Sequence, residues 1–287
     1  MSKNRRVLLL VLLAGALGVF AWLLRPPREP VYNRRPLSAW LKGLENWDGD
    51  TNDAAFVAFR EMGTNAIPAL LNVIQSGGPP LQKMISKLNR QQSVVDLPFG
   101  TPWHQTMAAS WALYAMGTNA KPALPVLTNL LFHSNALITS TLVMAGIGSE
   151  AIPILLSALT NQNYRIRHSA ASGLGWAHSD LDVVVPALIA MLQDSERIVR
   201  YTAASSLGEV HARPEIAVPA LMNALSSDDP LLRSTALISL GGFEGKANEA
   251  VPTVVAALKD KDETVRKTAA SVLKQIDPES AAKEGVR

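Results

Sequence analysis

A proline and an arginine recur together in this chain at one fixed step. The two series are Pro153, Pro186, Pro219 and Pro252, and Arg167, Arg200, Arg233 and Arg266, and the interval between neighbours is the same throughout both. A period in the range of roughly 20–50 residues is typical of stacked-repeat architectures, in which one unit cannot bury its apolar face alone and relies on its neighbours. We therefore expect the chain to form an elongated array of repeats.

Apolar residues predict a first helix in each repeat. Three columns keep the same step and lie four residues apart within a unit, which places them on one stripe of a helix. The columns are Ile166, Val199, Leu232 and Val265; Ala170, Ala203, Ala236 and Ala269; and Leu174, Leu207, Leu240 and Leu273. Gly175, Gly208 and Gly241 follow the leucines, and we expect them to end these helices with a positive φ.

A second helix in each repeat begins near the recurrent proline. Proline is tolerated in a first helical turn because the amide groups there have no intrahelical partner. Leucine or valine follows two and six residues after each proline of the series, so each unit is predicted to be a helical hairpin. With the further prolines Pro68 and Pro122, the chain is expected to hold six helix pairs and an unpaired last helix near residues 263–276.

The repeat unit reads V-R-x-x-A-A-x-x-L-G, then A-x-P-x-L-x-x-x-L, then an acidic turn. It resembles the HEAT-like repeat of the phycobilisome-lyase type, a relative of HEAT and armadillo repeats. The resemblance is strongest over 150–276, weaker over 52–75 and 104–148, and absent over 1–36. It implies an all-α fold, a right-handed αα-superhelix.

The same resemblance implies a scaffold or docking surface for a protein or peptide partner, with no catalysis and no cofactor. One alternative is a lyase that handles bilin chromophores, in which Arg167, Arg233 and His168 would hold the propionate groups. A second alternative is a purely structural spacer, for which surface substitutions would be harmless.

Residues 7–24 form an apolar run without charge, flanked by basic residues on both sides. As a helix the run would be about 27 Å long, close to the thickness of a hydrocarbon core of roughly 30 Å. We expect a single membrane anchor within residues 1–24, with the solenoid outside the cytoplasm. The alternative is a signal peptide cleaved after Ala21, which would give a secreted protein.

The rest of the chain is expected to divide into a tether, residues 25–36, and a repeat solenoid, residues 37–287. The tether is predicted from its four prolines and four arginines, a composition that favours extended chain. An insertion over residues 76–103 is predicted because the step from Pro68 to Pro122 is much longer than the step from Pro153 to Pro186.

Charge and composition exclude several function classes. Residues 1–36 hold seven Lys and Arg and one Glu, so the remainder of the chain has a net charge of −3 although the whole has +3. A solenoid without a basic surplus is not expected to bind nucleic acid. The chain has no cysteine, which removes disulfides and thiolate chemistry. His178 and His211 also keep the repeat step, but we interpret them as loop residues, and no metal or catalytic site is predicted.

Aromatic residues of the insertion are the first candidates for partner binding. Insertions in solenoids emerge on one face, and exposed aromatic residues favour interfaces. Phe99 and Trp103 are therefore candidate contacts. The alternative is that helix 81–91 packs on the stack and that both aromatic residues belong to the core.

The arginine series is expected to tie the turns of adjacent repeats together. Six residues before the arginines lies a column of Asn161, Asp194, Ser227 and Asp260, and arginine pairs well with carboxylates and loop carbonyls. Arg167 has an asparagine and Arg233 a serine in that column, so these two are expected to be free for a partner. Ser157 and Asn223, on the proline-bearing helices, are expected to line the concave face.

Overall fold

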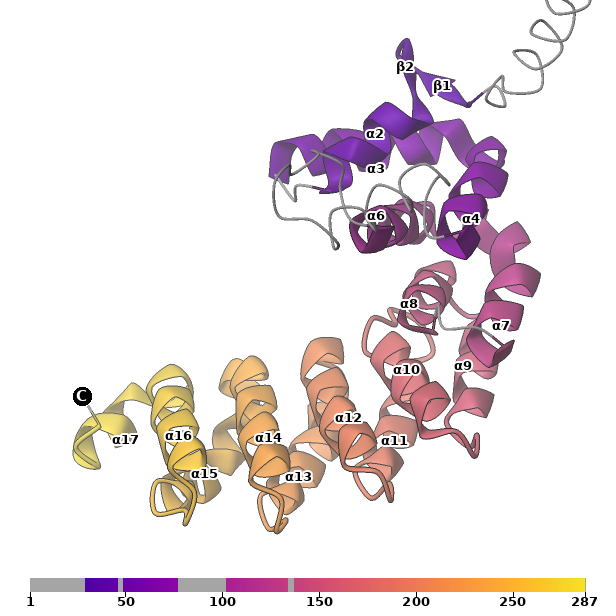
Figure 1. Cartoon of the computed structure of the whole chain (residues 1–287). Helices are drawn as coiled ribbons and strands as arrows, with labels where there is room; N and C mark the ends of the chain where they lie inside the picture. Colours follow the sequence, from indigo (N-terminus) through magenta and orange to yellow (C-terminus); the bar gives the residue numbers. More distant parts are fainter. Residues whose placement is uncertain (1–28, 46–48, 77–101, 134–136, 287) are drawn as a thin grey trace, which may run out of the picture.

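The computed structural model describes residues 29–45, 49–76, 102–133 and 137–286. These residues form a curved array of helical hairpins (Figure 1). Apart from one two-stranded hairpin, the described regular structure is helical. The prediction of an all-α solenoid is therefore confirmed.

Six helix pairs form the body of the described array, as the proline series predicts, and α16 matches the predicted last helix. The pairs are α3 (Gly49–Met62) and α4 (Ile67–Ser76), α6 (Pro102–Ala115) and α7 (Leu124–His133), α8 (Leu137–Ile147) and α9 (Ile152–Ala158), α10 (Tyr164–Leu174) and α11 (Leu181–Met191), α12 (Arg197–Val210) and α13 (Pro214–Ala224), and α14 (Pro230–Gly242) and α15 (Val251–Ala257). The 3₁₀ helices η1 (Gly63–Ala66), η2 (Gly117–Ala123) and η3 (Glu244–Ala250) precede α4, α7 and α15, and α16 (Glu263–Ile276) and α17 (Pro278–Lys283) end the array.

The core lies between the two helices of each pair and continues from one pair to the next. Every residue of the three apolar columns is buried. One cluster of buried apolar side chains extends from Leu37 in α2 (Leu37–Glu45) to Ala281 in α17. Each repeat therefore completes its core with its neighbours, which is the behaviour expected of a solenoid.

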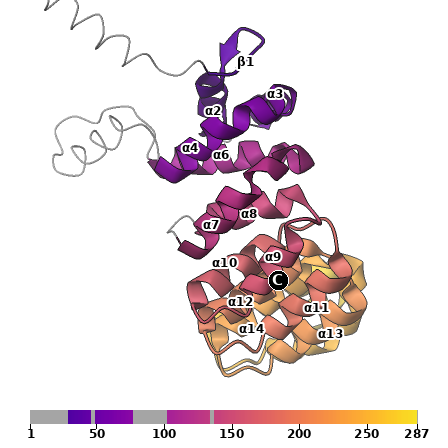
Figure 2. The same ribbon diagram turned by 90° about the vertical axis from the view of Figure 1, so that its right-hand side faces the viewer.

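The helices form two layers that differ in spacing. The first helices of the pairs, from α6 to α16, pack closely one on the next, whereas α9, α11 and α13 contact each other sparsely. Figure 1 shows α6, α8 and α10 on the inner side of the bend and α4, α7 and α9 on its outer side, and Figure 2 separates α10, α12 and α14 from α11 and α13. The closely packed layer lines the concave face. The expectation that the proline-bearing helices line it is wrong.

Small residues allow the inner layer to pack this closely. A Cβ atom added at Gly175 would lie 2.8 Å from the Oγ of Ser206, and one added at Gly208 would lie 2.7 Å from the Oγ of Ser239. Gly175 has a φ of −61°, while Gly208 and Gly241 lie within α12 and α14. These glycines therefore serve close helix packing, and the expectation of a positive φ at them is wrong.

Buried hydrogen bonds also join the helices of the inner layer. The hydroxyl of Ser206 donates to the carbonyl oxygen of Ala171 at 2.9 Å, and that of Ser239 to the carbonyl oxygen of Ala204 at 2.8 Å. Both bonds cross from one inner helix to the previous one. Because they are buried, they fix the spacing of the layer in addition to satisfying the hydroxyl groups.

A β-hairpin covers the start of the array. Strands β1 (Val31–Tyr32) and β2 (Arg35–Pro36) pair antiparallel, and Asn33 and Arg34 between them have φ values of 48° and 61°. Two successive residues with positive φ are the geometry of the tight turns that suit β-hairpins. The hairpin corrects the predicted tether for residues 31–36.

Contacts with α2 hold this hairpin in place. The indole N–H of Trp40 donates to the carbonyl oxygen of Tyr32 at 3.3 Å, and the guanidinium of Arg35 lies 5.3 Å from the Trp40 ring centroid. The arginines and prolines that suggested extended chain therefore take part in a turn and in a cation–π contact. Leu37, Trp40 and Leu41 of α2 are buried, as expected for a helix that closes the end of the solenoid.

Among the described residues, no helix combines the length and the apolar character needed to cross a membrane. The apolar run 7–24 lies outside the described residues, and so do residues 77–101 of the insertion.

Candidate partner-binding surface

The arginine series follows one edge of the solenoid, where a turn connects each outer helix to the inner helix of the next pair. Each of its four arginines donates from Nη1 to the backbone carbonyl oxygen six residues earlier, at distances between 2.7 and 2.9 Å. These bonds tie each arginine to the turn that leads into its own helix. They also satisfy carbonyl groups that the turn leaves unpaired.

Arg167 and Arg233 bind the next turn as well. The Nε and Nη2 atoms of Arg167 donate to the two carboxylate oxygens of Asp194 at 2.7 and 2.8 Å. Arg233 holds Asp260 in the same way, at 2.8 and 2.7 Å. These guanidinium hydrogen bonds keep the pKa values of both aspartates below their usual range. The side chain of Arg233 is only 4% exposed, so this pair is largely shielded from water.

The arginine series therefore joins adjacent turns, as predicted, but Arg167 and Arg233 are not free. The carboxylate that each one binds is the column residue of the following repeat, and not the column residue six positions before the arginine. The column also closes the turns: the side-chain oxygens of Asn161 and Asp194 accept the N–H two residues later at 2.8 Å. Asparagine, aspartate and serine all suit this role.

The series of bidentate arginine–aspartate pairs is interrupted at Arg200, which has only a longer ion pair with Asp229. The residue of the next turn that corresponds to Asp194 and Asp260 is Ser227, whose hydroxyl oxygen accepts the N–H of Asp229 at 3.2 Å. The Nη2 atom of Arg200 lies 3.7 Å from the Asp229 carboxylate, which is too long for a hydrogen bond. Arg197 binds that carboxylate bidentately, at 2.7 and 2.9 Å, and Asp229 also caps α14 by accepting the N–H of Leu231.

An open cleft of about 970 Å³ lies at this interruption. It is formed by the turn and helix ends of two successive repeats, and Asn223, a predicted partner contact, is part of its lining. The lining residues that carry charge are Asp194, Arg197, Arg200, Asp228 and Asp229. The cleft therefore contains two arginines and Ser227, which stands at the position where the neighbouring turns have an aspartate.

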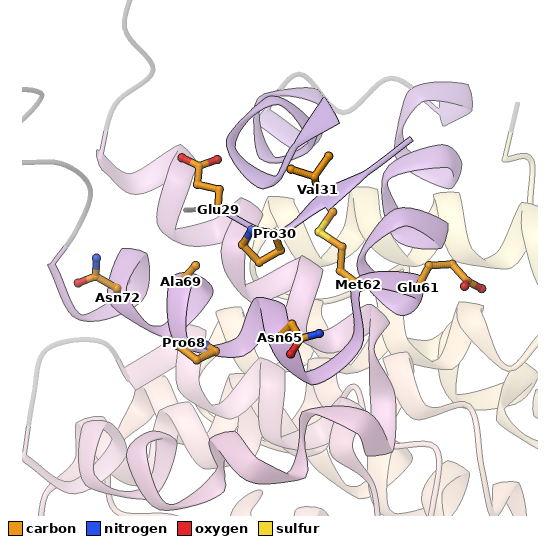
Figure 3. Close-up of a pocket in the computed structure, with 9 residues that line it drawn as sticks. All are labelled: Glu29, Pro30, Val31, Glu61, Met62, Asn65, Pro68, Ala69 and Asn72. Carbon is orange, nitrogen blue, oxygen red and sulfur yellow. The ribbon is translucent and has the colours of Figure 1, made fainter. Parts of the chain in front are cut away.

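A second pocket, of about 670 Å³, lies between the β-hairpin and α4 (Figure 3). Its wall includes the apolar side chains of Val31, Met62 and Pro68, and Figure 3 shows Glu29 and Glu61 at opposite ends. Glu29 accepts the backbone N–H of Ser38 at 2.9 Å. One of the two carboxylates thus stabilises the start of α2, and the pocket lining contains no basic residue among the described ones.

The concave face presents large apolar side chains to solvent. Leu231 is 41% and Ile238 is 62% exposed, and they lie on one stripe of α14, two helical turns apart. The buried stripe of Leu232, Ala236 and Leu240 faces the outer layer. The two exposed residues therefore point away from the paired helix, into the concave side of the array.

An aromatic cluster lies between α6 and the segment that follows α10. The rings of Trp111 and Trp176 meet edge to face at 5.4 Å, and Trp111 meets Tyr114 at 5.5 Å. The Tyr114 hydroxyl is 2.6 Å from Nε2 of His178, and burial raises the pKa of this tyrosine. The cluster connects α6 to the end of α10 across α8, where a Cβ added at Gly146 would lie 2.5 Å from the Tyr114 ring.

Three of the histidines are engaged within the fold. His178 contacts Tyr114, the ring of His211 packs against that of Phe243 at 5.8 Å, and Nδ1 of His168 is 2.9 Å from the Thr202 hydroxyl. Burial lowers the pKa of His168, so its neutral form is favoured. Across the described ranges, no group of three or more His, Asp and Glu side chains is arranged to hold a metal ion.

The remaining predicted contacts lie in different places. Ser157 and Asn223 are exposed, but they belong to α9 and α13 of the outer layer, so they do not line the concave face. Trp103 lies in the first turn of α6. Phe99 lies outside the described residues. Sequence reasoning missed Trp111, Trp176 and Ile238, because they stand outside the repeated columns.

Several solved structures are similar to this fold. The CpcE–CpcF complex of phycocyanin lyase from Nostoc sp. is 21% identical over 53% of this chain and 98% of its own, with a TM-score of 0.47. The karyopherin Kap121p is 14% identical over 86% and 30%, with a TM-score of 0.48, and human deoxyhypusine hydroxylase is 17% identical over 85% and 96%, with a TM-score of 0.38. No curated protein matches the chain.

The family assignment depends on the repeats themselves. The family model of HEAT repeats matches residues 138–208, 185–247 and 218–284, which together make up half of the chain. The matched region contains the arginine series, the aspartates that it binds and the inner helices α10, α12, α14 and α16. On this match, the chain belongs to the HEAT-repeat family.

Proposed function

We propose that the protein is a non-catalytic scaffold that binds a protein or peptide partner on its concave face. The observation that supports this most directly is the exposure of Leu231 and Ile238 on the inner layer. Exposed apolar side chains on a rigid surface favour protein contacts. The buried hydrogen bonds of Ser206 and Ser239 hold the helices that present them, which lowers the conformational cost of binding.

The proposal of a binding role without catalysis is supported by what the polar side chains already do. Arg167 and Arg233 are engaged with aspartates, and His178 contacts Tyr114. In the bilin-lyase alternative, Arg167, Arg233 and His168 would hold propionate groups. The two guanidinium groups would first have to release buried carboxylates, which makes this alternative less favourable than a scaffold.

We further propose that residues 7–24 anchor the solenoid to a membrane, with the repeats outside the cytoplasm. The uncharged apolar run and its basic flanks support this. Extraction of membranes with alkaline carbonate, followed by intact-mass measurement, tests it. An anchored protein remains in the pellet at full mass. A soluble protein that begins after Ala21 would identify the run as a cleaved signal peptide.

The insertion, residues 76–103, is proposed as a second contact region, with Phe99 and Trp103 as its aromatic candidates. A Phe99→Ala variant tests this part separately. We expect weaker partner binding with unchanged helical circular dichroism. Full binding by the variant would remove Phe99 from the proposed surface.

Site-specific photo-crosslinking in the producing cell tests the concave-face proposal. A benzoylphenylalanine residue at position 231 or 238 is expected to give a discrete cross-linked adduct, because these sites would face the partner. The matched control is position 183 on α11, where Val183 is 51% exposed on the outer layer. Equal adducts at 183 and 238, or none at 231 and 238, would contradict the proposal.

An Ile238→Asp variant provides the complementary loss of function. The side chain is 62% exposed, so the substitution should leave the melting temperature unchanged while a charge enters the proposed apolar contact. Val183→Asp is again the control. A partner that binds both variants equally well would place the interface elsewhere.

A further inference from the structure

We use the word junction for the contact between an arginine of the series and the turn of the following repeat. Two junctions, those of Arg167 and Arg233, show how this fold holds a carboxylate. In each, Nη1 of the arginine is fixed on a backbone carbonyl oxygen, and Nε and Nη2 form a fork for the two carboxylate oxygens. Asp194 occupies the fork of Arg167, and Asp260 occupies that of Arg233, with all four distances at 2.7–2.8 Å. The same site therefore occurs twice, each time with the carboxylate supplied by the next turn.

The junction between these two has the arginine without the aspartate. Nη1 of Arg200 is fixed on the carbonyl oxygen of Asp194 at 2.9 Å, so the guanidinium has the orientation seen at the other junctions. Ser227 stands where a ligating aspartate would be, and it belongs to the lining of the open cleft. The side chain of Arg200 is 25% exposed, against 13% for Arg167 and 4% for Arg233.

We propose that this cleft binds the carboxylate of an aspartate or glutamate side chain of a partner protein, with Nε and Nη2 of Arg200 as the donors. The proposal extends the scaffold function given above and depends on it for the identity of the ligand. The partner's carboxylate takes the position that Asp194 and Asp260 take at the neighbouring junctions. Gln193, Arg197 and Asn223 are the other side chains of the cleft lining that carry N–H donors.

The acidic residue already beside Arg200 does not prevent this binding. Asp229 is held by Arg197, and its carboxylate is 3.7 Å from Nη2 of Arg200. The occupied junctions carry an equivalent second acid, because Glu196 interacts electrostatically with Arg167, and Asp262 does so with Arg233. A carboxylate beside a second carboxylate is therefore the arrangement that this fold uses wherever the fork is filled.

Charge also favours a carboxylate over a phosphate at this site. Asp228 and Asp229 both belong to the lining of the cleft, and they repel a dianion more strongly than a single negative charge. The planar fork of an arginine matches the two oxygens of one carboxylate. A side-chain carboxylate thus fits the geometry and the local charge.

Nuclear magnetic resonance of the arginine Nε–H groups tests the site in the full-length protein. Acetate is the probe for an acidic side chain, acetamide is its neutral analogue, and inorganic phosphate tests the competing anion. We expect the Arg200 signal to shift in a saturable way with acetate at millimolar concentration, with no shift in acetamide and a weaker response to phosphate. Arg233, whose fork is filled, should not respond.

Substitution at position 227 supplies the decisive control. Ser227→Asp places a carboxylate in the fork, and the turn tolerates it because Asp194 and Asp260 accept the same N–H two residues later. The acetate-induced shift at Arg200 should fall at least about fivefold in Ser227→Asp and persist in Ser227→Ala.

An acetate response of Arg200 no larger than that of Arg233, or one that persists in Ser227→Asp, overturns the proposal. A stronger response to phosphate than to acetate also overturns it. These outcomes are separate from the scaffold function, since a protein that fails them but still cross-links a partner at position 238 loses only the carboxylate site.

Discussion

The C-terminal repeats and the N-terminal repeats of this solenoid are held together by different interactions. From α10 to α16, the junctions carry the same kinds of residue at a fixed step along the sequence: an arginine at the turn edge and small residues in the inner layer. Between α2 and the end of α10, contacts that follow no period also connect the helices, such as the Trp40–Tyr32 hydrogen bond and the Trp111–Trp176 ring contact. A continuous core needs neighbours in contact, but it does not need identical junctions.

The two regions also differ in how they join turns. In the C-terminal repeats, polar bonds at the edge carry the connection, and the buried pair of Arg233 and Asp260 is the clearest case. At the α6–α8–α10 junction, an aromatic cluster of Trp111, Tyr114 and Trp176 makes the connection. Ion pairs respond to pH, whereas aromatic packing does not, so the two regions should be separable by experiment.

The largest effect is expected from Arg233→Ala. Removing the arginine leaves the carboxylate of Asp260, only 14% exposed, without its partner. Breaking a buried ion pair in this way costs about 3–5 kcal/mol of unfolding free energy. Urea denaturation measures the loss. The matched control is Arg266→Ala, since Arg266 binds backbone carbonyls of its own turn. Equal losses in the two variants would contradict a special role for the ion pair.

Acidification should weaken the C-terminal repeats next. Hydrogen bonds from arginine lower the folded-state pKa of Asp194 and Asp260. Their contribution is therefore complete above the unfolded pKa of about 3.9 and is lost as pH falls through the lower folded-state values. Wild type should lose roughly 2 kcal/mol more than an Asp194→Asn, Asp260→Asn variant between about pH 5 and pH 2.

Denaturant titrations at each pH check this expectation. The unfolding free energies of wild type and variant should differ at neutral pH and converge in acid. Protonation of Asp194 and Asp260 removes from wild type the ion pairs that the substitutions have already removed from the variant. Parallel pH profiles would mean that other carboxylates control the acid response. The aromatic cluster should contribute nothing to the difference, since it contains no carboxylate.

Trp176→Ala tests the N-terminal connection and is expected to have a smaller effect. The side chain is 38% exposed, and its edge-to-face contact with Trp111 is worth about 1 kcal/mol beyond area burial. The protection of α6 amides from hydrogen exchange should fall, while that of α14 should not. An equal loss of protection in both helices would mean that the two regions unfold as one unit.

Periodicity predicted the regular region well, because each column of repeated residues corresponds to one contact that recurs in every repeat. The apolar stripes of α10 to α16, the helix pairs and the role of the arginines all follow from a fixed step in the sequence. Periodicity did not predict that Arg167 is paired, since the aspartate that binds it belongs to the next unit. A search of the following turn finds this partner, but a search of the preceding turn does not.

The irregular region was less predictable for a physical reason. Trp111 and Trp176 are far apart in the sequence and follow no period, so only the three-dimensional path of α6, α8 and α10 brings them together. The apolar pattern does not show which helices line the concave face, because both helices of a pair have an apolar stripe. Small residues of the inner layer, such as Gly175 and Gly208, do distinguish the two layers, but a glycine after a leucine column equally predicts a helix end.

The smallest expected effect is a gain in stability from Ser227→Asp, which would make the interrupted junction like its neighbours. The new carboxylate can bind Nε and Nη2 of Arg200, and part of this gain is offset by repulsion from Asp229, 3.7 Å from Nη2. A partly exposed ion pair of this kind contributes about 0.5–1 kcal/mol. Thermal unfolding at low and high salt measures it, with Ser227→Asn as the uncharged control. If Ser227→Asp is no more stable than Ser227→Asn at low salt, the Arg200 fork is not oriented like those of Arg167 and Arg233, and the difference between the junctions is one of backbone geometry instead of one missing carboxylate.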